Sequence, residues 1–264
     1  MTEERAHIYP DWDNLPIKYL ILSCQDFIVF IDSENDLDWK TTDQFDKREI
    51  CPEKLVELNS ILNSTARVES IPTDKLQEKV VVNFKRQVGE ALVRAFEDDF
   101  DNATQMIEAA EEFVTNRNIE QSRYIYLTGS AIAVTGLSLV GVILWLLRDW
   151  VTNLLGTTGF YLGLSMICGA LGAFLSIILR MGKEKLDFHA SKELHYLESL
   201  SRLSAGMISA FLIALTIKAG ILLPVINKID SMHTAMLLGG LVAGSSERLA
   251  PSIIKKIDGS KPSK

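Results

Sequence analysis

The sequence predicts an all-α membrane protein, in which an N-terminal, mainly helical cytosolic domain precedes four transmembrane helices. A mean hydropathy of +0.15 is high for 264 residues of which 23% are charged, so apolar and charged residues must be segregated. Residues 1–123 hold 26 acidic and 14 basic side chains, a net charge of -12, whereas residues 124–264 hold 8 and 13, a net charge of +5. The second part also contains four long apolar stretches, which its basic residues flank mainly on one side.

The composition of the first part excludes several classes of protein. An acidic domain is a poor ligand for nucleic acid, whose affinity for proteins comes largely from Lys and Arg. Cys24, Cys51 and Cys168 have neither disulfide nor metal spacing, so we expect no metal and no cofactor. The N-terminus lacks a basic start followed by an apolar run, which predicts no signal peptide and a cytosolic first domain.

Residues 1–51 form an acidic segment whose structure the pattern leaves open. Residues 15–31 are apolar but interrupted by Gln25 and Asp26, and they fit either two short strands or a buried helix. The acidic residues 32–38 resemble a calcium-binding loop, but Leu37 stands where such a loop needs Gly and Asp43 where it needs Glu. We therefore expect a solvated acidic loop there.

Residues 52–123 predict a cytosolic helical domain. Pro52 opens a helix whose apolar residues Leu55, Leu58 and Leu62 share one face. A longer run after Asp74 repeats apolar residues every three or four positions. Those residues are Val80, Phe84, Val88, Ala91 and Ala95.

An acidic turn at residues 98–102 then precedes a further helical run. This part resembles the helical hairpin of a tetratricopeptide-type (TPR-like) repeat, although no second copy follows at a 34-residue offset, and a generic helical hairpin is the alternative. The domain carries no catalytic constellation, so we expect it to dock a cytosolic protein partner and the chain to have no enzymatic activity. The candidate docking residues are Phe100, Ala103, Ile107 and Ala110.

Residues 124–254 predict a transmembrane domain of four helices. Residues 124–147 and 154–179 contain no charge, and residues 203–226 contain one, which suits spans of about 20 residues. The fourth stretch, 235–254, is free of charge only over its first 12 residues, about 18 Å of helix, so it either crosses or re-enters.

Basic residues predict the orientation of these helices. With the N-terminus inside, 11 Lys and Arg flank the inner ends and two, Arg148 and Lys228, flank the outer ends. Both termini are then cytosolic, the number of spans is even, and residues 255–264 form a basic cytosolic tail. An amphipathic connector, 181–202, joins the second and third spans on the cytosolic side. The expected location is a bacterial inner membrane.

Small residues recur at four-residue spacing along the predicted spans, which lets helices approach closely in lipid. Packing within one bundle and self-association are both consistent with this pattern, and its extent favours a homo-oligomer. The glycines singled out for helix packing are Gly159, Gly163, Gly169, Gly240 and Gly244.

Ionisable residues inside membrane spans are energetically costly, so we take each of them as a candidate functional residue. Lys218 lies about 12 Å from the outer end of the third span, and Glu247 lies in the fourth. Either the two form a buried pair that controls conduction, or Lys218 extends outward while Glu247 pairs with Arg180, Arg202 or Arg248. All five are candidate gating residues.

Two stretches, GALGAFLSIILR (169–180) and AGSSERLAP (243–251), resemble patterns in uncharacterised multi-pass bacterial membrane proteins. In those proteins the second pattern reads Gly-Phe-Ser-Glu-Arg, and Ser245 replaces the Phe here. The resemblance covers about the last 140 residues and brings no function with it. It implies that Arg180, Glu247 and Arg248 act as one polar cluster in the inner leaflet.

These features together predict a channel-like or membrane-perturbing effector whose cytosolic domain senses a partner. Such a layout is typical of bacterial antiviral defence or stress systems. A passive membrane scaffold that recruits a cytosolic partner is the alternative. A transporter function fits the sequence less well, because the sequence shows no inverted repeat and no pair of broken helices.

Overall fold

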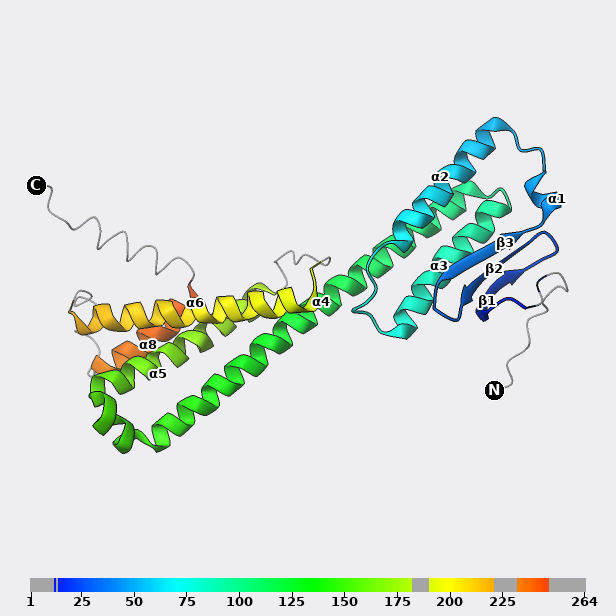
Figure 1. The fold of residues 1–264 in the computed structure, drawn as a ribbon. Helices are drawn as coiled ribbons and strands as arrows, with labels where there is room; N and C mark the ends of the chain where they lie inside the picture. The colour runs from blue at the N-terminus through cyan, green and yellow to red at the C-terminus, as the bar shows by residue number, and fades with distance from the viewer. Residues whose placement is uncertain (1–11, 13, 182–189, 221–231, 247–264) are drawn as a thin grey trace, which may run out of the picture. The chain divides into compact units, whose positions relative to one another are not determined.

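The computed structural model describes residues 12, 14–181, 190–220 and 232–246, and these are mostly helical (Figure 1). The chain divides into two compact units, residues 1–121 and residues 122–264, here called the N-terminal and C-terminal units. Helix α4 (Phe100–Leu146) contributes residues to both. The mostly helical class is confirmed, but the all-α class is wrong, because the N-terminal unit also contains a β-sheet.

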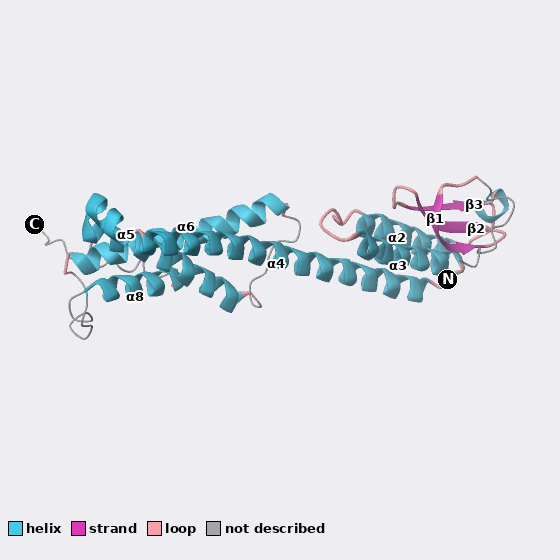
Figure 2. Ribbon diagram, turned by 90° about the horizontal axis from the view of Figure 1, so that it is seen from below, coloured by secondary structure: helices cyan, strands magenta, loops and turns pink. Residues whose placement is uncertain are grey.

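The sheet has three antiparallel strands in the order β1-β2-β3 (Figure 2). They are β1 (Ile17–Ser23), β2 (Phe27–Asp32) and β3 (Leu37–Thr41). Residues 15–31 therefore form two strands, and the alternative of a buried helix is wrong. Strand β3 was not expected at all.

The middle strand explains why the sequence pattern was ambiguous. Phe27, Val29 and Ile31 of β2 pack in the main core, whereas Ile28 and Phe30 pack on the opposite face with Trp12. A strand that is buried on both faces is apolar at every position, so the alternation that identifies a half-buried strand is missing.

The acidic residues after β2 form a largely exposed hairpin turn before β3. Asp32 Oδ1 accepts hydrogen bonds from the backbone N–H groups of Glu34 (2.9 Å) and Asp36 (2.8 Å), and Asn35 has a φ of 70°. Asp and Asn favour such turns because their side chains bond to nearby backbone and they tolerate positive φ. The chain then returns along β2 as β3.

A helical layer completes the N-terminal unit. It consists of α1 (Asp43–Asp46), α2 (Pro52–Glu69), α3 (Glu78–Phe96) and the first part of α4. Their apolar stripes and one face of the sheet share a single core. The stripe of α3 agrees with the expected periodicity at Phe84, Val88, Ala91 and Ala95, but α2 buries Leu58 and Ile61 and leaves Leu55 exposed.

A tight acidic turn joins α3 to α4. Asp98 has a φ of 64°, and the N–H of Asp99 donates to the carbonyl of Arg94 (2.9 Å), which closes the end of α3. Lys54 and Arg48 contact the Asp98 carboxylate at 2.9 and 3.8 Å. The turn is therefore held by ion pairs to the segment that enters α2.

The C-terminal unit contains three helices long and apolar enough to cross a membrane: α4, α5 (Arg148–Arg180) and α6 (Lys192–Lys218). A shorter apolar helix, α8 (Met232–Ser245), packs with α5 and α6, and each of these three contacts the other two (Figure 1). The described parts of the four apolar stretches thus lie mainly in helices.

Two helix boundaries differ from the expected spans. Gly156 (φ 74°, ψ 159°) interrupts α5, so its long straight part begins after this residue and not at Leu154. Helix α6 ends at Lys218, and Gly220 follows with a φ of 74°, the conformation that commonly terminates helices. Lys218 is therefore the last residue of α6, and it is exposed within one chain.

Candidate functional site

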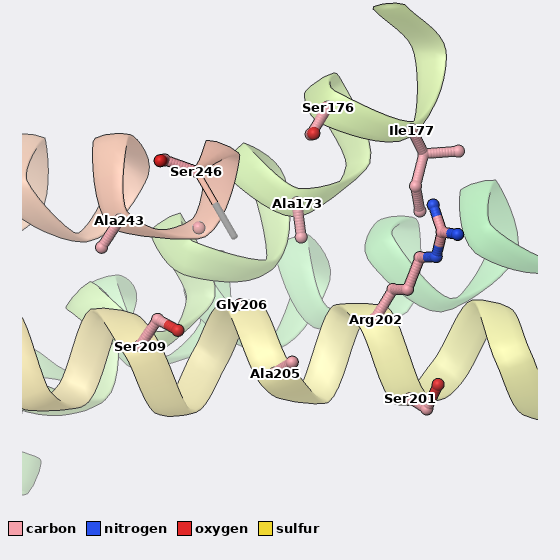
Figure 3. Close-up of a pocket in the computed structure, with 11 residues that line it drawn as sticks. Ala173, Ser176, Ile177, Ser201, Arg202, Ala205, Gly206, Ser209, Ala243 and Ser246 are labelled. Carbon is pink, nitrogen blue, oxygen red and sulfur yellow. The ribbon is translucent and has the colours of Figure 1, made fainter. Parts of the chain in front are cut away.

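A polar pocket of about 250 Å³ lies between α5, α6 and α8 (Figure 3). Hydroxyl groups, one guanidinium and small apolar residues line it. The lining residues are Ala173, Ser176, Ile177, Ser201, Arg202, Ala205, Gly206, Ser209, Ala243, Gly244 and Ser246. Five of these eleven residues are polar, although the helices that carry them are largely apolar.

Glycines bring the three helices together beside this pocket. A Cβ at Gly169 of α5 would lie 2.5 Å from the carbonyl oxygen of Gly206 of α6, and a Cβ at Gly244 of α8 would collide with the backbone of Gly169. A side chain at any of the three would force the helices apart. Small residues at such crossings allow backbone-to-backbone contact in lipid.

Three of the four pocket serines differ from the buried hydroxyls of this unit, whereas Ser201 donates to the Glu198 carbonyl of its own helix. Ser130 and Thr216 each donate to a carbonyl of their own helix, at 2.8 Å in both cases. In contrast, Ser176, Ser209 and Ser246 make no side-chain hydrogen bond to any described residue. Their hydroxyls therefore remain available to water or to a polar ligand.

Arg202 supplies the positive charge of the pocket. Its side chain extends from α6 towards Ile177 of α5 (Figure 3), and 28% of it is exposed. One of its terminal nitrogens donates to Glu198 Oε1 at 3.3 Å, and the guanidinium lies 5.8 Å from the ring centre of Tyr126. Glu198 and Tyr126 thus help to hold the guanidinium at the edge of the pocket.

A layer of buried polar residues lies next to Arg202 between α4 and α6. Tyr126 and Ser130 of α4 and His195 and Ser199 of α6 are each at most 1% exposed. Sequence reasoning missed this layer and the pocket serines. On α6 the signal was present, because Ser201, Arg202, Ala205, Gly206 and Ser209 recur at the spacing of one helix face.

The predicted gating residues are not brought together as a group. Arg202 lines the pocket, and Arg180 lies one turn beyond the pocket residue Ile177 on α5. Lys218 is the last residue of α6, nine residues beyond the pocket residue Ser209 and about 24 Å of helix from Arg202. Glu247 and Arg248 lie outside the described residues.

The placement of Ser246 bears on the expected Lys218–Glu247 pair. Ser246 lines the pocket together with Arg202 and Gly206, so the described chain reaches its last residue beside the middle part of α6. Lys218 is exposed at the C-terminal end of that helix. The Lys218–Glu247 pair stays a prediction, because Glu247 lies outside the described residues.

The five predicted packing glycines fall into two groups. Gly169, Gly240 and Gly244 lie against neighbouring helices, and a Cβ at Gly240 would lie 2.7 Å from the carbonyl oxygen of Ser165. A Cβ at Gly163 would meet no atom within 4 Å, and one at Gly159 would meet only Leu155 of its own helix. Within this chain Gly159 and Gly163 therefore make no close helix crossing.

The predicted docking residues of the N-terminal unit are taken up by its core. Ala103, Ile107 and Ala110 are at most 3% exposed, and Phe100 packs against the same cluster. Their expected role at a partner surface is wrong, because the stripe that was read as a binding face is the stripe that joins α4 to α3 and the sheet.

A different surface of the N-terminal unit is open. A hollow of about 460 Å³ lies between the edge strand β1 and the start of α3, lined mainly by Tyr19, Leu20, Ile21, Val82 and Asn83. At its side Lys18 Nζ donates to Glu78 Oε1 at 2.6 Å, and this hydrogen bond lowers the pKa of Glu78 and raises that of Lys18. An edge strand beside a hollow is a common site for an added peptide strand.

Neither unit presents a recognisable catalytic or metal centre in its described part. No group of three or more His, Cys, Asp or Glu side chains is placed there to hold a metal ion. The pocket offers hydroxyl donors and one cation, which suits binding of a polar or anionic group or passage of water and ions.

Comparison with protein families, with curated proteins and with solved structures finds no match to this chain.

Proposed function

We propose that this chain is a non-enzymatic, oligomeric membrane effector of a bacterial inner membrane. Its N-terminal unit receives a cytosolic protein partner, and its C-terminal unit responds by letting ions or water cross the bilayer. The observation that carries the proposal is the polar pocket between α5, α6 and α8. Polar groups inside apolar helix bundles are costly and usually serve a path or a ligand.

The topology of the proposal has four crossings and cytosolic termini. Three helices have the length and composition to cross, and the distribution of basic residues supports an even number. Helix α8 has 14 residues, about 21 Å, so the fourth crossing of the proposal, which needs about 30 Å, is longer than this helix.

The unequal burial of the apolar helices supports self-association. In its most apolar window α4 is 11% buried within one chain, whereas α5 and α6 are each 39% buried. Exposed apolar residues such as Ile132, Leu139 and Ile143 cover this part of α4. We propose that second copies of the chain, together with lipid, cover that face.

The direct test is ion flux through proteoliposomes that contain the full-length protein. We expect a leak of a trapped ion-sensitive dye, and a Ser209→Leu substitution, which fills the pocket, should abolish it. Ser204→Leu is the matched control, because Ser204 is an exposed residue of the same helix and should leave the leak unchanged.

The scaffold hypothesis makes the opposite prediction. If vesicles with the wild-type protein retain the dye, both without and with a captured cytosolic partner, the effector function is contradicted. The passive scaffold then remains as the function. Equal leaks from Ser209→Leu and wild type would show that the pocket is not the path.

A further inference from the structure

The hollow of the N-terminal unit lies along the open edge of an outer strand. Strand β1 pairs with β2 on one side, and no described strand pairs with it on the other (Figure 1). Three consecutive residues of β1 line the hollow: Tyr19, Leu20 and Ile21. Because consecutive side chains of a strand point to opposite faces, a space that touches all three lies beside the edge of β1. Every second residue of such an edge turns its backbone N–H and C=O groups away from the sheet.

The opposite wall of the hollow is the exposed face of α3. All four exposed residues of this helix line the hollow: Glu78, Lys79, Asn83 and Arg86. Between them and the strand, Val82 and Ile31 join Ile21 as apolar lining. The volume of about 460 Å³ lies within the range of roughly 300–1,000 Å³ that is usual for binding clefts. The hollow can therefore receive apolar side chains of a strand that is added to β1.

The rim of the hollow carries a positive charge that has no counterion. Lys18 pairs with Glu78 at 2.6 Å, and Arg86 pairs with Glu90 at 3.2 Å, so these charges balance. Lys79 is exposed and forms no ion pair with a described residue. The N-terminal part of the chain has a net charge of -12, which makes this lysine a local exception. The rim therefore complements an acidic side chain.

Two features of β1 count against a second copy of the chain as the occupant. The register of its pairing with β2 shifts twice, once before Tyr19 and once after Leu20. The strand also contains Lys18. Irregular pairing and lysine are features that protect edge strands from pairing with copies of themselves. A second copy would also bring the same positive rim, whereas an acidic segment of another protein complements it.

We propose that an extended, acidic segment of a cytosolic protein partner binds this hollow as a fourth strand beside β1. Its backbone pairs with the open edge of β1, and its apolar side chains enter the hollow beside Ile21 and Val82. An Asp or Glu of the segment contacts Lys79. The inference rests on the proposed function, because it identifies where the N-terminal unit receives its partner. It does not require that the protein conduct ions.

The test begins with a displayed library of random peptides of about 10 residues, selected against the full-length protein in detergent. We expect the selected peptides to alternate apolar with polar residues and to contain Asp or Glu. The strongest of them, labelled with a fluorophore, then serves as the probe in polarisation measurements. Asn83→Trp fills the hollow from an exposed position, so it should weaken binding of this probe about tenfold or more.

Asn63→Trp is the matched control, because Asn63 is an exposed residue of α2 that does not line the hollow. It should bind the probe like the wild type. Lys79→Glu should weaken binding about threefold at low salt and less at high salt. Lys40→Glu makes the same change at an exposed position of the other outer strand, β3, and should leave binding unchanged. Equal losses within either matched pair would overturn the site.

Amide hydrogen exchange tests the added strand itself. The probe should slow exchange in β1 and leave β3 unchanged, because backbone pairing protects the amides of the edge that it joins. Binding without slower exchange in β1 would overturn the strand addition. A selection that enriches no peptide beyond the same selection on Asn83→Trp would overturn the proposal. Dissociation of a peptide-free oligomer by Asn83→Trp would also overturn it, because a second copy would then occupy the edge.

Peptide binding without any dye leak would support this docking site and count against the effector function. A leak without any peptide binding would do the reverse, so the two proposals fail separately.

Discussion

Individual charged residues of the N-terminal unit act through a few specific partners. Lys85 is a buried lysine of α3 whose Nζ lies 2.7 Å from Asp36 Oδ1 and 3.4 Å from Glu69 Oε1. The same Glu69 oxygen accepts a hydrogen bond from the N–H of Leu37 at the start of β3. Lys85 therefore ties α3 to the β2–β3 turn and to the end of α2.

Replacing Lys85 by Met should destabilise the protein. The substitution keeps most of the apolar stem but removes two charge-assisted contacts, and the partly exposed carboxylates can return to water, so we expect a loss of about 1–2 kcal/mol. Urea unfolding of the full-length protein, followed by circular dichroism, measures it. Lys79→Met is the control, since Lys79 is exposed and should change the stability by less than about 0.5 kcal/mol. Equal effects of the two would contradict the role of Lys85.

The Lys18–Glu78 pair predicts an acid-dependent contribution to stability. The hydrogen bond from Lys18 lowers the pKa of Glu78 below its ordinary value of 4.5, so the folded state favours the ionised carboxylate. Its contribution is present above that ordinary value and is lost as the pH falls through the folded-state pKa. The melting temperature of Lys18→Met should therefore be lower than that of the wild type at pH 7 and should converge with it in acid.

Lys47→Met is a suitable comparison for this measurement, because Lys47 and Asp43 are 4.0 Å apart and both almost fully exposed. It should follow the wild type at every pH. A difference for Lys18→Met that is the same at pH 7 and at pH 3 would show that the ion pair is not its cause.

At the scale of elements, helix crossings in the C-terminal unit depend on where glycine faces another backbone. Gly172 of α5 lies against Leu241 and Ser245 of α8, and an added Cβ would collide with the Leu241 carbonyl oxygen. Gly163, two to three turns earlier on the same helix, faces open space. Two glycines with the same appearance in the sequence therefore have different roles.

Gly172→Ala should separate α5 from α8 and lower stability by about 1–3 kcal/mol, the usual cost of overpacking. Gly163→Ala should be neutral or slightly stabilising, because alanine favours helix by up to about 1 kcal/mol over glycine. Thermal unfolding of both purified variants in the same detergent compares them directly. A larger loss for Gly163→Ala would indicate instead that Gly163 contacts a second copy of the chain.

At the scale of the whole molecule, the segregation of charge predicts on which side of the membrane each part lies. The N-terminal unit belongs to the acidic part of the chain, and Cys51 is one of its exposed residues. Arg148 stands between the first two apolar stretches, where few basic residues are found. The two positions should therefore lie on opposite sides of the bilayer.

A membrane-impermeant maleimide tests this topology in intact spheroplasts. Cys51 should be labelled only after the membrane is disrupted. In a Cys51→Ser background, Arg148→Cys should be labelled without disruption. Labelling of Cys51 in intact spheroplasts would reverse the orientation, and protection of both positions would place the α4–α5 connection inside.

The sequence by itself determined the positions of the long apolar helices, the change from an acidic to a basic part and the periodic face of α3. These features depend on the composition and spacing of neighbouring residues, which local physics is enough to interpret. It also identified Arg202 and Gly244 as notable, although not as neighbours in one pocket.

Only the tertiary structure decided which of the apolar residues face each other. Ala103, Ile107 and Ala110 have the spacing of a helix face, but their burial depends on α3 and the sheet being there to cover them. Strand β2 was ambiguous because burial on both faces removes the alternation of polar and apolar residues. The pocket was hidden for a similar reason, since its hydroxyls come from three helices that meet only where glycines of each allow their backbones to touch.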